Sequence, residues 1–334
     1  DDYQVEEDQA AEVLEEKTAD FFEEAVDAQI TRVGGVFQIT DERDGEKADV
    51  EKAVEEITER LEDMENGKSI EIEVDSEKEK AQICKKDLEK IQDELGSAEI
   101  ELKETGKKQE VILLAGILNG QIIMPEKECS LQKILGEYLD SGFSQEALDM
   151  VASVVYDAAL YAEMEISERH EAEAMPDYVE AGMEAALDGK KDLKIENNTK
   201  APLYIEAYID GDGKLVCAIY GEETRDDERS ISFERESKEE KQNVVYKEDD
   251  SLGAGKMKTE ENGSPEYTVT LRKIVKEDGE ETEEDIDTSE YKSVDSIVHV
   301  GIKTEDETIR GSLREAIATQ DKEKIEQAVS RAKK

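Results

Sequence analysis

The sequence is poor in the residues that most often build metal sites, disulfide frameworks and membrane spans. Among 334 residues it has no Trp, two His, four Pro and three Cys. Cys84, Cys129 and Cys217 show no C-x-x-C spacing, which excludes a recognisable zinc pattern and a paired disulfide framework. No apolar run approaches the ~20 residues that a transmembrane helix needs. We therefore expect no metal, no cofactor and no membrane insertion.

Basic residues are also scarce. Lys and Arg number 43 against 90 Asp and Glu, which gives a formal net charge of −47. Such a charge repels nucleic acid and anionic lipid, so we expect neither as a partner. The acidic segment 209–214 (IDGDGK) lacks the ligand spacing of a calcium loop, and a hairpin turn explains it better. The sequence shows no signal peptide and begins at Asp1 rather than Met, so we expect a mature or trimmed form.

Charged residues make up 40% of the chain, a composition close to that of disordered proteins. The apolar residues nevertheless fall in periodic blocks separated by acidic linkers, which indicates folded modules with acidic surfaces. A chain of 334 residues exceeds the usual size of one hydrophobic core. We predict an α+β, multi-domain protein.

Residues 1–108 are predicted to form a small α+β domain. Its elements are an acidic helix near Ala10 and Leu14, a hairpin over 28–40 around Gly34-Gly35, an amphipathic helix over 50–64 capped by Asp49, a strand over 69–74, and a helix over 86–95 ending at Gly96.

Residues 109–222 are predicted to form an α+β core. An apolar helix turns at Asn119-Gly120 into a short strand within 111–125, and 144–166 is the longest apolar-periodic helix. The segment 193–221 alternates strand residues with turn residues and should pack on that helix, with Cys217 buried as a small hydrophobe.

Residues 223–304 read as a polar linker followed by an elongated β-ribbon module. Strands are predicted over 230–234, 267–276 and 280–287, the last two joined by a turn at Asp278-Gly279. Residues 305–334 are predicted to be a tail of two short helices over 312–334, with a capping box at Ser312 and Glu315 and a second cap at Asp321.

Three segments in the middle of the chain carry a family resemblance. They resemble the VanW family of Gram-positive cell-envelope proteins, and they are SVVYDAALYAEMEISERH (153–170), PDYVEAGMEAA (176–186) and the strands of 193–221. RDGEKADVEKAVEEI (43–57) is similar to the peptidoglycan-binding domain that commonly precedes VanW domains, and 291–303 resembles the five-glycine domain that often closes them. The resemblance implies a cell-wall-associated or secreted protein whose partner is peptidoglycan or another wall polymer.

The chain departs from the family at its most polar motif. Alignment on Tyr156 and Asp157 places Asp149 and Met150 where family members have Cys-Gln, and Ala172 where they have a second His. A thiolate nucleophile needs a sulfur and a neighbouring base, and this position offers neither. The departure favours a protein without catalysis.

Several residues remain as candidates for a site. His170 could act as a base oriented by Glu184 or Asp149, or it could be a helix-end His paired with an acid. Tyr156 and Tyr178 could stack on sugars or belong to the core, and Arg169 is a further candidate for binding.

Three functions follow. The first is a non-catalytic cell-envelope protein that binds or spaces at the peptidoglycan layer. The second is a weak cell-wall-modifying enzyme that uses His170 and Glu184. The third is a secreted ligand or adhesin for a host or neighbouring-cell protein, suggested by the acidic surface. The loss of the Cys-Gln motif favours the first.

Overall fold

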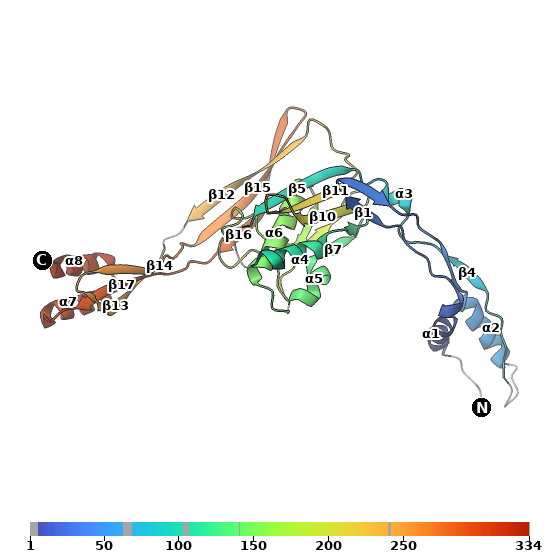
Figure 1. Ribbon diagram of the computed structural model, residues 1–334, viewed down its shortest axis with the longest axis horizontal. Helices are drawn as coiled ribbons and strands as arrows, with labels where there is room; N and C mark the ends of the chain where they lie inside the picture. Colours follow the sequence, from blue (N-terminus) through green and yellow to red (C-terminus); the bar gives the residue numbers. More distant parts are fainter. Residues whose placement is uncertain (1–5, 63–68, 103–106, 140, 240–241, 334) are drawn as a thin grey trace.

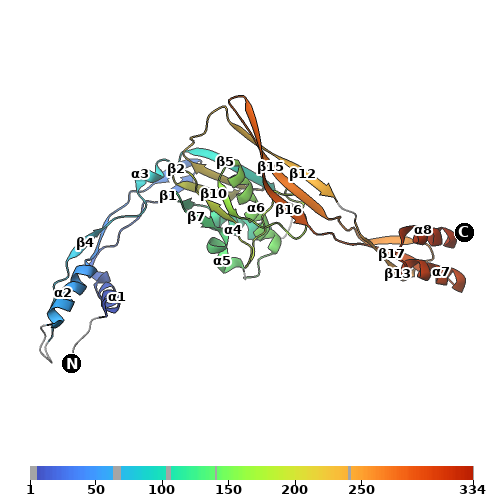
Figure 2. The ribbon, with the colours of Figure 1, turned by 180° about the vertical axis from the view of Figure 1, so that it is seen from behind.

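A computed structural model describes residues 6–62, 69–102, 107–139, 141–239 and 242–333. The molecule is α+β and multi-domain, as predicted, and it is elongated, with helices α1 and α8 at opposite ends (Figures 1 and 2). An N-terminal arm, a central core, a β-ribbon and a C-terminal helical unit follow one another along the long axis. The core therefore lies between the arm and the ribbon.

The N-terminal arm consists of two helices beside a two-stranded sheet. Its elements are α1 (Glu7–Thr18), η1 (Ala19–Phe21), β3 (Gly45–Ala48), α2 (Val50–Glu62) and β4 (Ser76–Glu79). The predicted cap of α2 is confirmed, because Asp49 Oδ1 accepts a hydrogen bond from Lys52 N at 3.1 Å. Residues 63 and 64 of the predicted helix lie outside the described residues. The strand prediction for 69–74 is wrong, since the strand that pairs with β3 begins at Ser76.

The predicted hairpin joins the arm to the core. It consists of β1 (Ile30–Val33) and β2 (Val36–Ile39), and both turn glycines, Gly34 and Gly35, have positive φ. Phe37 meets the rings of Tyr204 and Tyr220 edge to face, with centroids 5.4 and 5.3 Å apart. The hairpin thus covers part of the outer face of the core sheet.

The core is a four-stranded antiparallel sheet in the order β5-β11-β10-β6, covered on one face by helices. The strands are β5 (Asp93–Glu101), β6 (Gln121–Ile123), β10 (Leu203–Ile209) and β11 (Lys214–Gly221), and the helices are α4 (Lys108–Leu118), α5 (Leu131–Leu139) and α6 (Gln145–Tyr161). A second small sheet, β7 (Glu128–Ser130), β9 (Lys194–Glu196) and β8 (Glu165–Glu168), lies beside it. Cys217 is fully buried here, as expected.

The predicted helix over 86–95 is wrong. Only α3 (Lys85–Leu88) is helical, and Gly96 lies inside β5 instead of ending a helix. A Cβ on Gly96 would lie 2.2 Å from the backbone nitrogen of Ala162, so glycine allows β5 to cross the end of α6. Because β5 pairs with β11, a strand from before residue 108 belongs to the core sheet.

The β-ribbon is a three-stranded antiparallel sheet in the order β12-β15-β16. Its strands are β12 (Ser230–Glu239), β15 (Tyr267–Glu277) and β16 (Glu280–Tyr291). The turn at Asp278-Gly279 is confirmed, with both residues at positive φ. Leu271 of β15 is buried in the same apolar cluster as α6, so the ribbon packs directly on the core.

The C-terminal unit has its own apolar core. It contains β13 (Val244–Gly253), β14 (Met257–Glu261), β17 (Ser296–Lys303), α7 (Glu307–Ala318) and α8 (Lys322–Ala332), and β13 runs parallel to β17. Leu313, Ile317, Ile325 and Val329 of the helices pack with Val300 and Ile302. The predicted start near Ser312 is wrong: α7 begins after Asp306, whose Oδ1 accepts from Thr308 N at 2.9 Å. The cap at Asp321 is confirmed by a 3.2 Å bond from Lys324 N.

Candidate functional site

Helix α6 places a row of polar side chains in the interior of the core. Its apolar face is so wide that Asp149, Ser153, Tyr156 and Asp157 are all buried. Ser144 caps the helix by accepting from Ala147 N at 3.4 Å. Buried polar groups of this kind need partners, and those partners determine what each side chain can do.

Asp149, which the resemblance aligned with a Cys, connects the loop that contains Leu187 to α6. Its Oδ1 accepts from Leu187 N at 2.9 Å and from Gln145 Nε2 at 2.8 Å. Ser153 Oγ accepts from Ala185 N at 3.0 Å one turn further along. Burial raises the pKa of Asp149. The carboxylate is therefore occupied by structural bonds from the backbone and an amide.

His170 is paired with an acid of its own segment. Its Nε2 lies 3.0 Å from Glu168 Oε1, and the side chain is 39% exposed. Lys194 Nζ lies 2.8 Å from the other oxygen of Glu168, and the bonds from Lys194 and His170 lower the pKa of this carboxylate. Among the described residues, no hydrogen bond or ion pair joins His170 to Asp149 or Glu184.

Arg169 and Glu184 form a buried ion pair. The side chain of Arg169 is 4% exposed and that of Glu184 is 0% exposed. Arg169 Nη2 lies 2.9 Å from Glu184 Oε1, and Arg169 Nε donates to the Glu184 carbonyl at 2.8 Å. Burial would lower the pKa of Arg169, but the carboxylates of Glu184 and Asp287 outweigh it and the net shift is upward.

The same ion pair reaches the β-ribbon. Arg169 Nη1 donates to Ser289 Oγ at 2.7 Å and to Asp287 Oδ2 at 3.1 Å, both on β16. The Tyr291 hydroxyl donates to Glu184 Oε1 at 2.6 Å and accepts from Gly182 N at 2.7 Å. We call these residues, Arg169, Gly182, Glu184, Asp287, Ser289 and Tyr291, the Arg169 network. It joins the core to the ribbon through contacts that are more than a hundred residues apart in sequence.

The two tyrosines considered for sugar stacking belong to the packed interior. Tyr156 is 2% exposed, and the Arg169 guanidinium carbon lies 5.4 Å from its ring centroid. Tyr178 is half-buried against the apolar core, and burial raises the pKa of both phenols. The face of Tyr156 is thus turned to Arg169.

Asp157 was missed as a site residue. It is 8% exposed, and its Oδ1 has no hydrogen-bond partner among the described residues. Burial and the nearby Glu184 carboxylate raise its pKa to about 8, against the smaller influences of Arg169 and Arg235. Arg235 of β12 is itself paired with Glu180. The sequence signal was available, since an acid stood in the middle of an apolar helical face.

A second charged contact fastens the end of α6 to the ribbon. Glu163 follows the helix with φ of 59°, an uncommon value for a residue with a side chain. Arg229 Nη2 lies 2.8 Å from Glu163 Oε1, and Lys273 of β15 pairs with the same carboxylate. Burial would raise the pKa of Glu163, but these cations lower it to about 2.

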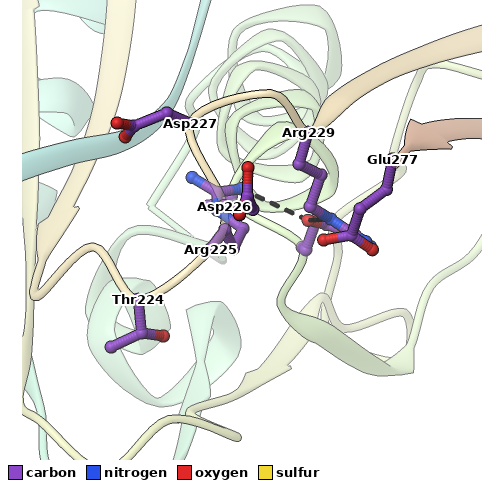
Figure 3. Close-up of a pocket in the computed structure, with 8 residues that line it drawn as sticks. Thr224, Arg225, Asp226, Asp227, Arg229 and Glu277 are labelled. Atoms are coloured by element: carbon purple, nitrogen blue, oxygen red, sulfur yellow. Dashed lines mark hydrogen bonds and ion pairs between the residues drawn. The ribbon is translucent and has the colours of Figure 1, made fainter. Parts of the chain in front are cut away.

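An open hollow of about 730 Å³ lies over this contact. In Figure 3 the Arg229 and Glu277 side chains point toward each other, at 2.6 Å, while Asp227 points away. Arg225 is likewise bound to Glu223 at 2.6 Å. The cations of the hollow are therefore neutralised by carboxylates from the protein.

No group of three or more His, Cys, Asp or Glu in the described part of the chain is arranged to hold a metal ion. No helix within the described ranges is both long and apolar enough to cross a membrane.

Comparison with protein families identifies three modules. Residues 147–220 match the model of the VanW like protein family, residues 2–70 match the family described as "Putative peptidoglycan binding domain", and residues 233–303 match the G5 domain. The chain therefore combines a VanW-like segment with segments that match these two other families. The VanW-like segment runs from α6 to β11. The G5 segment begins inside β12 and contains the other two strands of the β-ribbon together with β13, β14 and β17.

No curated protein matches this chain. The solved structure "Crystal structure of HP0197-G5" is 17% identical and covers 22% of this chain and 99% of its own, with a TM-score of 0.16. "IgA1 Protease G5 domain structure" is 22% identical and covers 23% and 94%, with a TM-score of 0.17.

Proposed function

We propose that this protein is a non-catalytic cell-wall-associated protein that binds peptidoglycan and acts as a spacer at the peptidoglycan layer. The observation that carries the proposal is the state of the polar side chains at the family's motif positions. Asp149 replaces the Cys and is bound by Leu187 N and Gln145, while Glu184 is bound by Arg169 and Tyr291. Groups held in this way are not free to exchange protons with a substrate.

Spacing is supported by the shape of the molecule and by its internal contacts. The arm, core, ribbon and C-terminal unit follow one another along one axis (Figure 1). The Arg169 network and the Glu163 contact fix the ribbon to the core at separate points. An elongated body with fixed joints keeps its two ends apart, as a spacer must.

The proposed location is the outer side of the envelope of a Gram-positive bacterium, either wall-associated or released. The domain boundaries that we propose are 1–108, 109–222, 223–304 and 305–334, with β5 contributed to the core sheet from the first of these. The peptidoglycan-binding-type segment is the proposed attachment point, since it is the module whose family description names that polymer.

Co-sedimentation with purified peptidoglycan sacculi tests the binding. We expect the full chain to sediment with the sacculi, and we expect a chain that begins after the arm, at Asp93, to stay in the supernatant. Failure of the full chain to sediment would contradict wall binding. Blotting of cell-wall and medium fractions separates this function from that of a secreted ligand for a host or neighbouring-cell protein.

A further inference from the structure

A groove of about 960 Å³ lies in the N-terminal arm. It runs between α1 and η1 on one side and β3, β4 and the start of α2 on the other. Its apolar lining is formed by small residues and one phenylalanine, namely Ala11, Ala19, Ala25, Ala48, Val50 and Phe22. Small residues leave room for an extended chain to approach the backbone.

Some carboxylates of the groove build its walls. Glu79 Oε2 accepts from Ala25 N at 3.1 Å, and Asp27 Oδ1 accepts from Gln82 N at 2.6 Å. Glu77 is paired with Lys47 at 3.0 Å. The two hydrogen bonds tie the segment after η1 to β4 and to the residues that follow it, and the ion pair joins β3 to β4.

Three other carboxylates of the groove take no part in these bonds. Glu15, Glu24 and Glu51 line the groove, are exposed, and make no hydrogen bond or ion pair through their side chains within the described part of the chain. They come from α1, from the segment after η1 and from the first turn of α2, so the fold brings three separate segments together here. Like charges around a hollow repel one another, but they focus a negative potential that attracts a cation into it.

We propose that this groove binds the amine-bearing stem peptides of peptidoglycan, which rests on the wall-binding function proposed above. Two lysines, Lys47 and Lys80, also line the groove, but Lys47 is paired with Glu77 and the carboxylates of the lining outnumber them. A free ammonium group of the ligand would pair with Glu15, Glu24 and Glu51. The glycan strand is neutral or anionic, and its sugar rings bind proteins by stacking on aromatic side chains. The described lining offers Phe22 alone for such stacking, so the groove suits the peptide better than the glycan. Phosphate-rich wall polymers would be repelled by the carboxylates.

Retention of the full chain on sacculi, before and after acetylation of their free amines, tests the ligand. We expect acetylation to weaken retention roughly tenfold, as the loss of a few exposed charge contacts implies. The triple variant Glu15→Gln, Glu24→Gln, Glu51→Gln should be weakened to a similar extent on untreated sacculi and should not respond to acetylation.

The matched control is Glu12→Gln, Glu55→Gln, Glu59→Gln, which removes the same charge from exposed positions of α1 and α2 outside the groove. It should bind like the wild type. Equal loss in both triple variants would show that only the overall charge matters and would overturn the groove proposal.

The two proposals fail in different ways. If the wild-type chain sediments equally with native and acetylated sacculi, wall binding stands and the amine site is wrong. If it sediments with neither, wall binding itself is wrong. A soluble amine-bearing muropeptide that competes with the sacculi, where its acetylated form does not, would support both.

Discussion

At the scale of single residues, Arg169 has the largest consequences. A buried ion pair is costly to desolvate, and it is tolerated here because almost every polar atom around it is bonded. The resemblance marked Arg169 and Glu184 in advance. It could not mark Tyr291 or Ser289, since their role depends on the docking of β16 against the core, which no local pattern reveals.

Replacement of Arg169 by Met should be strongly destabilising. The change leaves Glu184 charged and buried without its cation, so we expect the free energy of unfolding to fall by about 3–5 kcal/mol. Calorimetry of the full chain measures the effect. Arg272→Met is the control, because Arg272 pairs with Asp285 and Glu283 on the exposed surface of the ribbon and should cost about 1 kcal/mol or less. Equal effects of the two changes would contradict the described burial.

Asp157 predicts a pH dependence of stability. Its pKa is raised to about 8 from the ordinary 3.8, so the folded protein keeps a proton that the unfolded chain releases. This stabilising contribution is complete below about pH 4 and is lost as the pH rises to about 8. Between pH 5 and 7 this group lowers the free energy of unfolding by about 1.4 kcal/mol for each pH unit of increase.

The variant Asp157→Asn isolates this contribution. The amide cannot ionise, so the variant should be more stable than the wild type at pH 8, and the difference should shrink toward pH 5. Chemical unfolding at a series of pH values measures both chains. Parallel pH profiles would show that Asp157 does not carry the raised pKa.

At the scale of elements, the sequence was sufficient where local chemistry decides the structure. The hairpins at Gly34-Gly35 and Asp278-Gly279 were predicted because their turns need positive φ. The strand β5 was missed because glycine signals both a helix end and a close backbone approach, and here the approach to α6 decides. The alternating segment 69–74 is not a strand, since strand formation also depends on a partner.

The crossing of β5 over α6 gives a prediction for this scale. Gly96→Ala should cost about 3 kcal/mol, because its Cβ would overlap the backbone at Ala162 and neither element can move freely. Gly116→Ala is the control: it lies in α4 with nothing within 4 Å of the new Cβ, and it should stabilise by about 0.5–1 kcal/mol. Thermal unfolding of both variants measures the contrast, and a neutral Gly96→Ala would show that β5 does not lie against α6.

At the scale of the whole molecule, an acidic chain is organised into modules that follow one another and are joined by buried charge contacts. The α+β class and the three family resemblances were accessible from the sequence, because each module keeps its own local pattern. The joints were not accessible, since they combine residues from different modules. Arg169 and Glu184, two of the candidate residues, accordingly connect the core to the ribbon.

The most direct test of this account is the muropeptide profile of sacculi after incubation with the full chain. The account predicts a profile that superimposes on that of sacculi in buffer alone, while the protein remains bound to them. The contradicting result is a peak that the wild-type chain adds or removes, while the His170→Ala or Glu184→Gln variant leaves the profile unchanged. That result would show that the protein transforms the polymer it binds.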